Sequence, residues 1–75
     1  MNFLKFRSDT TDVWVNPKHV VTLTYNPNYD CVEMRLSGGR VVLAVDFKDP
    51  DNVLHYLETG YHYSLSVLEG GENHD

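Results

Sequence analysis

Apolar and polar residues alternate on both sides of the segment Ser37–Arg40, and this is the clearest local pattern in the chain. Alternation with a period of two is typical of β-strands, and the glycines within the segment allow the positive φ angles of a tight turn. The pattern therefore predicts a β-hairpin with a two-residue turn. Such a turn sets three apolar pairs opposite each other on one face: Leu36 and Val41, Met34 and Leu43, and Val32 and Val45. Together with Phe47, these residues form the predicted core face. Val42 and Ala44 fall on the opposite, mixed face, which carries both apolar and polar residues.

The segment before this hairpin predicts a third strand in the same sheet. Residues 21–25 alternate in the same way, and the turn-forming residues Asn26–Tyr29 separate them from the next strand. A four-residue loop would extend the apolar face across an antiparallel meander, with Leu23 opposite Val32 and Val21 opposite Met34.

Two further strands are predicted nearer the N-terminus. The segment Asn2–Arg7 can place Leu4 and Phe6 on one side, and Val13–Val15 is a short apolar run. Asn16–His19 follows this run and contains a proline. Because proline fixes φ and has no N–H group, we expect these residues to form a turn or a single helical turn.

The pattern changes to helical spacing after Phe47. Asp49 is a good N-cap, and a proline at position 50 suits the first helical position. These signals predict a helix from about Pro50 to about Thr59, ended by Gly60. A helix this short depends on packing against the sheet, here through the apolar residues Val53, Leu54 and Leu57.

The C-terminal residues complete the predicted domain. Residues 61–68 alternate again and predict a last strand, and residues 70–75 are expected to be a flexible acidic tail. The sequence thus predicts one α+β domain over residues 1–69: an antiparallel meander of four to five strands, able to curl toward a small barrel, with one short α-helix. A chain of 75 residues has a small core, so a large enclosed catalytic cleft is not expected.

Charge and composition narrow the class of protein. Eleven acidic and six basic residues give a net charge of −5, the longest apolar run is Val41–Val45, and the N-terminus lacks the apolar region of a signal peptide. A single cysteine, Cys31, cannot form an internal disulfide. We therefore expect a soluble cytoplasmic protein that does not act at a membrane.

Candidate catalytic and metal-ligating residues do not form a recognisable motif. The four histidines and Cys31 lie in different predicted elements without the spacing of a zinc site. Cys31 would face Asp46 in the predicted hairpin, and a nearby carboxylate disfavours a reactive thiolate. Asp46 and Glu33 share a predicted face with Arg35, whose charge would screen the two carboxylates. We expect a protein that is not an enzyme, with no catalytic residue, metal or cofactor.

Aromatic residues give the strongest indication of function, because the chain has more amphipathic rings than one small core can bury. Tyrosine and tryptophan are enriched at protein-binding hot spots. The candidate partner-binding residues are Tyr29, Asp30, Tyr56, Tyr61 and Tyr63. We expect a small adaptor or regulator that binds a protein through exposed aromatic and acidic surface, and an edge strand leaves a homodimer open.

The sequence leaves two alternative functions open. The acidic excess could imitate nucleic acid, as in a virus- or phage-encoded inhibitor that blocks a basic host protein. A small β-rich domain could also be an Sm-like or OB-like RNA binder. The six basic residues are scattered and outnumbered, so we do not expect a nucleic-acid partner.

The stretch Val13–Leu57 also resembles a known family. It contains Val15-Asn16-Pro17 before an alternating strand, then Arg35-Leu36-Ser37-Gly38-Gly39-Arg40-Val41-Val42, then a short capped helix. In these features it is similar to the small FlbD-type flagellar-operon proteins, and it departs from them in its longer loop over residues 26–30, its predicted last strand and its acidic tail. The resemblance implies a non-enzymatic regulatory or adaptor protein and offers no catalytic residue.

Overall fold

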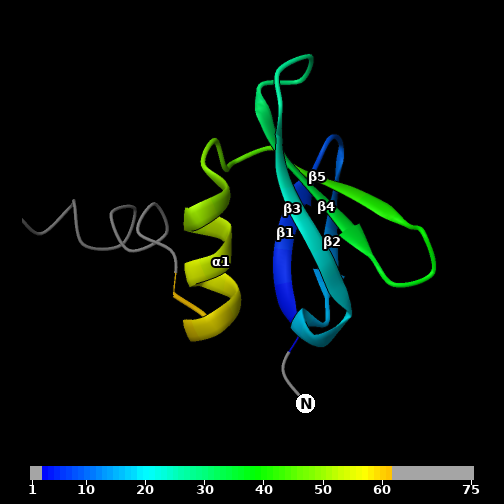
Figure 1. Cartoon of the computed structure of the whole chain (residues 1–75), viewed down its shortest axis with the longest axis vertical. Helices are drawn as coiled ribbons and strands as arrows, with labels where there is room; N and C mark the ends of the chain where they lie inside the picture. The colour runs from blue at the N-terminus through cyan, green and yellow to red at the C-terminus, as the bar shows by residue number, and fades with distance from the viewer. Residues whose placement is uncertain (1–2, 62–75) are drawn as a thin grey trace, which may run out of the picture.

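Five antiparallel strands and one helix form an α+β fold in the computed structural model, which describes residues 3–61 (Figure 1). The elements in chain order are β1 (Leu4–Ser8), β2 (Thr11–Val15), the 3₁₀ turn η1 (Pro17–His19), β3 (Val20–Asn26), β4 (Cys31–Leu36), β5 (Val41–Ala44) and α1 (Pro50–Thr59). β1 pairs with β2, and the other strands form a sheet in the order β3-β4-β5. The predicted α+β class is confirmed, and within residues 3–61 the strands form two sheets and no closed barrel.

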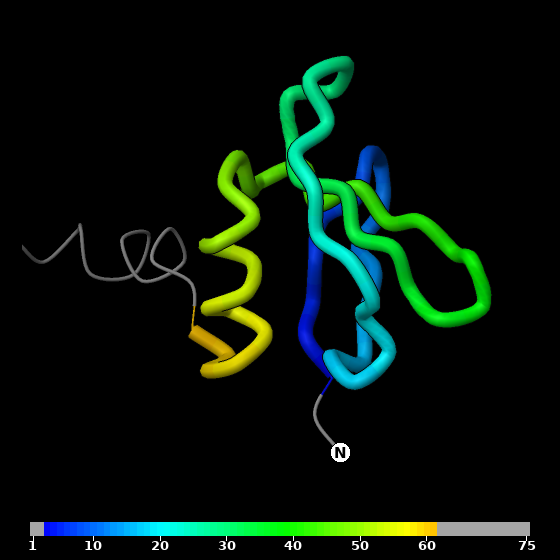
Figure 2. The backbone as a smooth tube through the Cα atoms, viewed as in Figure 1, coloured from blue at the N-terminus to red at the C-terminus, as the bar shows by residue number. Residues whose placement is uncertain are grey.

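Backbone hydrogen bonds hold the chain after β5 against a strand of each sheet. The Val45 N–H, just after β5, donates to the Arg7 carbonyl in β1 at 3.1 Å, and the Val32 N–H in β4 donates to the Phe47 carbonyl at 3.0 Å. The chain after β5 therefore passes close to β1 before it enters α1, as the tube in Figure 2 shows. The helix lies along the side of the strands, beside β1 and β3 (Figure 1).

The β4–β5 hairpin is observed, but its predicted register is wrong by one residue. The strands pair Met34 with Val42 and Val32 with Ala44. Gly38 and Gly39 have φ angles of 88° and 87°, and the Leu36 N–H donates to the Arg40 carbonyl at 2.8 Å. The connection therefore comprises Ser37, Gly38 and Gly39, three residues instead of the predicted two.

This one-residue change turns the side chains of β5 over, because adjacent residues of a strand point to opposite faces. Val42 and Ala44, which the prediction placed on the mixed face, are buried. Val41 is exposed, and Leu43 and Val45 are half-buried. The prediction that Val41, Leu43 and Val45 form the core face is therefore wrong.

The register of β3 against β4 also differs from the prediction. Leu23 faces Met34, two residues from its predicted partner, because the loop comprises residues 27–30 and Asn26 pairs with Cys31. A shift of two residues keeps Leu23 on its predicted face. Val21 lies in the irregularity between Val20 and Thr22 and is 65% exposed, so its predicted place opposite Met34 is wrong.

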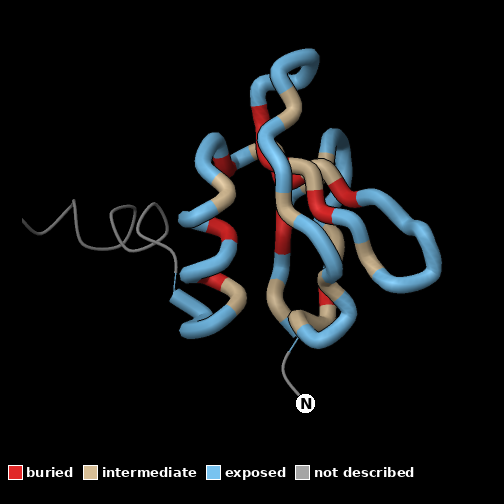
Figure 3. Tube along the Cα trace, viewed as in Figure 1, coloured by how far each residue is buried: buried red, intermediate tan, exposed pale blue. Residues whose placement is uncertain are grey.

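The core lies between the strands and the helix, where buried segments face each other in Figure 3. Three of its aromatic rings pack together: the ring centroids of Phe6 and Tyr56 are 5.1 Å apart, those of Phe6 and Phe47 5.7 Å, and those of Phe47 and Tyr56 5.6 Å. These rings come from β1, the connection before α1, and α1 itself. The predicted place of Phe47 in the core is confirmed, and Phe6 is buried beside it.

The helix begins and ends where the sequence predicts. The Asp49 side chain accepts a hydrogen bond from the Asp51 N–H at 2.9 Å, and Gly60 ends the helix with a φ of 74°. Its packing face differs, since Val53 and Tyr56 are buried and Leu54 is exposed. The predicted packing of Leu54 is wrong. The predicted strand over residues 61–68 lies outside the described residues beyond Tyr61, as does the predicted tail.

Candidate protein-binding surface

The loop between β3 and β4 is held in shape by its first residue. The Asn26 side-chain carbonyl accepts hydrogen bonds from the Asn28 N–H at 2.9 Å and from the Tyr29 N–H at 3.4 Å. Its amide group donates to Glu33 Oε1 at 3.0 Å. This arrangement is typical of an asparagine that begins a turn. Asn26 therefore ties the loop to the neighbouring strand.

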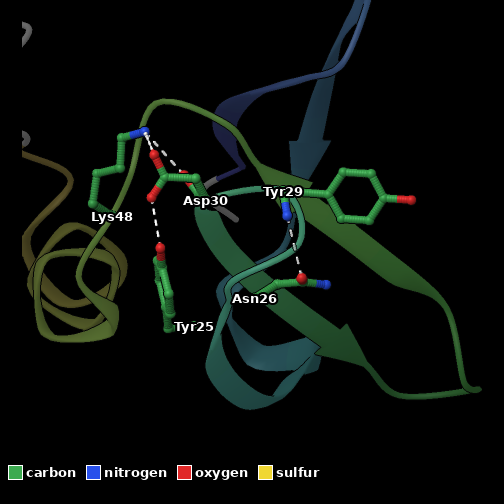
Figure 4. A network of polar contacts seen from close by, with 5 residues as sticks. All are labelled: Tyr25, Asn26, Tyr29, Asp30 and Lys48. Atoms are coloured by element: carbon green, nitrogen blue, oxygen red, sulfur yellow. Dashed lines mark hydrogen bonds and ion pairs between the residues drawn. The ribbon is translucent and has the colours of Figure 1, made fainter.

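The end of the same loop is held by Asp30, which contacts residues from two other segments (Figure 4). The Tyr25 hydroxyl donates to Asp30 Oδ1 at 2.6 Å, and Lys48 Nζ donates to Asp30 Oδ2 at 2.7 Å and to the Asp30 carbonyl at 3.0 Å. Asp30 has a φ of 52°, a conformation that aspartate adopts more readily than most residues. The strand β3, the loop and the connection to α1 thus meet at one carboxylate.

These contacts change the acidity of the groups involved. The hydrogen bond from Lys48, with a smaller contribution from Tyr25, lowers the pKa of the Asp30 carboxyl below its ordinary value. The hydrogen bond to Asp30 raises the pKa of the Tyr25 hydroxyl. At neutral pH the site therefore holds a carboxylate, a phenol and an ammonium group, whose charges sum to zero.

Tyr29 stands apart from this network. Its ring is 66% exposed, and in Figure 4 it points away from Tyr25, Asp30 and Lys48. Its backbone is held by Asn26 and its neighbour Asp30 by Lys48. We call the set Tyr25, Asn26, Tyr29, Asp30 and Lys48 the braced loop.

The structure brings together two of the five predicted site residues. Tyr29 and Asp30 are adjacent in the braced loop, whereas Tyr61 is exposed beyond the far end of α1 (Figure 1). Tyr56 is only 6% exposed and its hydroxyl donates to the Lys5 carbonyl at 2.9 Å, so the expectation of an exposed Tyr56 ring is wrong. Tyr63 lies outside the described residues.

Three members of the braced loop, Tyr25, Asn26 and Lys48, were missed as site residues. Tyr25 already lies opposite Asp30 in the predicted register, but the sequence does not show that its hydroxyl donates to the Asp30 carboxylate. Lys48 is 18 residues from Asp30 and comes from an irregular connection. No local pattern marks such a contact, because it depends on how α1 packs against the sheet.

The structure shows the surroundings of two residues that the sequence analysis weighed for catalysis, Cys31 and Glu33. Cys31 is fully buried, and desolvation raises the pKa of its thiol, which favours the unreactive protonated form. Glu33 is engaged by Asn26 and by Arg35, whose Nη2 lies 3.3 Å from Glu33 Oε2. Within residues 3–61, no group of three histidine, cysteine or acidic side chains is placed to hold a metal ion.

The comparisons with known proteins add no relative. Protein-family models, curated protein sequences and solved structures give no match to this chain. In the described part of the chain, α1 is the one α-helix, and it is too short to cross a membrane.

Proposed function

We propose that this protein is a non-enzymatic protein-binding module and that the braced loop is its contact surface. The observation that carries the proposal is the Tyr29 ring, which is exposed at the tip of a loop whose two ends are held by Asn26 and Asp30. A ring carried on a backbone that is already held loses less conformational entropy on binding than a ring on a free loop. The surface around it is polar and electrically balanced, which suits the rim of a protein interface.

The charged residues support a protein partner over the two alternatives. Three of the six basic side chains, those of Lys5, Arg35 and Lys48, lie next to carboxylates. Such pairs reduce the positive charge with which the protein could bind the phosphate groups of a nucleic acid. They also reduce the negative charge with which it could imitate a nucleic acid. The resemblance to FlbD-type proteins likewise implies an adaptor or regulator.

The test is a binding measurement with two matched tyrosine variants. The full chain captures partners from lysate, the partner is purified, and its Kd is measured for the parent, Tyr29→Ser and Tyr61→Ser. Both tyrosines are exposed, but Tyr29 lies in the loop between β3 and β4 whereas Tyr61 follows the C-terminal end of α1. A hot-spot tyrosine contributes about 2 kcal/mol, so we expect Tyr29→Ser to weaken binding about 30-fold and Tyr61→Ser to change it less than about threefold.

Other results would favour the alternatives. Binding that disappears at high salt and is unaffected by Tyr29→Ser would indicate an acidic surface that imitates nucleic acid. Co-purification of nucleic acid that protects the same residues would indicate an RNA-binding domain. Equal losses in both tyrosine variants would contradict the assignment to the braced loop.

A further inference from the structure

The outer edge of β3 is open in the part of the chain that the structure describes. β3 pairs with β4 and is the terminal strand in the order β3-β4-β5. An edge strand presents backbone N–H and carbonyl groups that can pair with another strand, and many proteins block such an edge with a proline or a lysine. β3, Val20–Asn26, contains neither a proline nor a charged residue. Its own sequence therefore does not block the addition of a strand.

The hydrogen bonds of β4 show which residues of β3 face outward. The Leu36 N–H donates to the carbonyl of the residue before β5, so the backbone groups of this β4 residue face β5. Successive residues of a strand turn their backbone groups to opposite sides, so those of Glu33 face β3, where the partner of Glu33 is Thr24. Thr24 is therefore bonded within the sheet. Its neighbours Leu23 and Tyr25 turn their N–H and carbonyl groups to the open edge.

The regular part of β3 has a pattern that is symmetric about Thr24. A register irregularity follows Val20, so the regular pairing covers residues 22–26. In this segment Leu23 and Tyr25 alternate with three polar residues, of which Thr24 is the central one. A two-fold axis at Thr24 sets Leu23 of one copy opposite Tyr25 of the other, and these are the residues whose backbone groups face outward. The edge is thus complementary to itself.

The exposed side chains beside this edge also suit a second copy. Val21 lines an apolar groove of about 420 Å³ together with Leu54 of α1, and both side chains are exposed. Pairing about Thr24 brings the exposed Tyr25 ring of the second copy next to Val21. An aromatic ring beside a β-branched residue is a favourable cross-strand contact. The pairing therefore covers apolar surface that one copy leaves in water.

The charges at the two ends of β3 favour an antiparallel orientation. Lys18 and Glu58 line the groove near the start of β3, and the ion pair of Asp30 with Lys48 lies near its end. Antiparallel pairing sets the start of one strand beside the end of the other. Each cation can then meet an anion of the second copy.

We propose that β3 binds β3 of a second copy of this chain, in an antiparallel pairing about a two-fold axis at Thr24. The dimer then has one continuous sheet in the order β5-β4-β3-β3-β4-β5. Leu23 of each copy exchanges backbone hydrogen bonds with Tyr25 of the other, and the two Thr24 side chains lie opposite each other. Tyr29 lies outside residues 22–26, so formation of the dimer does not depend on a partner at the braced loop.

Sedimentation velocity and hydrogen exchange on the full chain test this pairing. A strand-edge interface is small and dissociates on dilution, so we expect the mass to rise from 8.6 kDa toward twice that value over about a hundredfold range of concentration. Exchange of the Leu23 and Tyr25 amides should slow as the dimer forms, whereas exchange of the Thr24 amide, already bonded to β4, should change little. A chain that stays monomeric, or a dimer that leaves the Leu23 and Tyr25 amides unchanged, overturns the proposal.

Three substitutions at two exposed threonines locate the axis. Thr24→Lys sets two ammonium groups opposite each other and should weaken the dimer at least about tenfold, whereas Thr22→Lys, on the same face of β3, should weaken it less than about threefold. An equimolar mixture of Thr24→Lys and Thr24→Glu should restore the dimer, because opposite charges then meet at the axis. The chemical shifts of Phe6 and Tyr56 report whether the core of each variant is folded. Equal losses in the two lysine variants, or a mixture that stays monomeric, would contradict an axis at Thr24.

Discussion

At the scale of single residues, Asp30 connects the β3–β4 loop to β3 and to the segment before α1. Its carboxylate accepts from Tyr25 and Lys48, and its backbone carbonyl accepts from Lys48 as well. All three side chains are exposed, so water and salt screen the interactions. Their effect is expected to be local: they fix the loop that displays Tyr29.

Substitution of Lys48 should change the pKa of Asp30. In the folded protein this pKa is lowered, chiefly by the Lys48 hydrogen bond, so the charged carboxylate holds the loop. The stabilisation is present above the unfolded-state pKa and is lost as the pH falls through the lower folded-state value. In Lys48→Met we expect the pKa to rise toward the ordinary value, measured by the carboxyl ¹³C shift during a pH titration.

A matched control separates this contact from a general change in charge. Lys18→Met removes the same charge from η1, away from Asp30, and should leave the Asp30 titration almost unchanged. An Asp30 pKa that is the same in the parent and in Lys48→Met would contradict the contact.

At the scale of elements, the register of β4 against β5 can be tested with one pair of valines. Val42 is 3% exposed and Val41 is 42% exposed, although they are neighbours in one strand. Val42→Ala removes two buried methyl groups and should destabilise the protein by about 2 kcal/mol, whereas Val41→Ala should cost less than about 0.5 kcal/mol. Urea denaturation measures both. The two-residue turn expected from the sequence would reverse the order of the two losses.

The elements themselves were predictable because each has a local cause. Asp49, Pro50 and Gly60 set the limits of α1, and a proline after β2 imposes η1. The registers were not predictable, because they depend on whether Ser37 joins Gly38 and Gly39 in the turn and on where the β3–β4 loop closes. Both choices become fixed only when the two sheets and α1 pack together.

The residues of the candidate site also divide into those that the local sequence predicts and those that distant contacts determine. Exposure of Tyr29 and Tyr61 follows from their places in a loop and after a helix, and both are observed. The burial of Tyr56 could not be predicted from the sequence. Helical spacing allows the packing face of α1 to contain Val53 and Leu57 together with either Leu54 or Tyr56. Its burial is decided by contacts distant in sequence: the rings of Phe6 and Phe47 and the Lys5 carbonyl.

At the scale of the whole molecule, Cys31 can report how the fold opens. It is the first residue of β4 and fully buried, and desolvation raises the pKa of its thiol. A thiol reagent can reach it only after the structure opens, so labelling follows the opening equilibrium. For a stability of about 5 kcal/mol, we expect labelling to be roughly 10³- to 10⁴-fold slower in buffer than in urea.

The same measurement distinguishes opening of the braced loop from opening of the whole domain. Cys31 adjoins Asp30 on one side. On its other side the Val32 N–H donates a hydrogen bond to the carbonyl of Phe47, in the connection that leads to α1. We therefore expect access to require separation of β4 from that connection, so Val42→Ala should accelerate labelling about 30-fold, in proportion to its loss of stability. Lys48→Met should accelerate labelling only slightly. If it matched Val42→Ala without lowering the urea midpoint, the loop would open on its own, and the rigidity assigned to the surface around Tyr29 would be wrong.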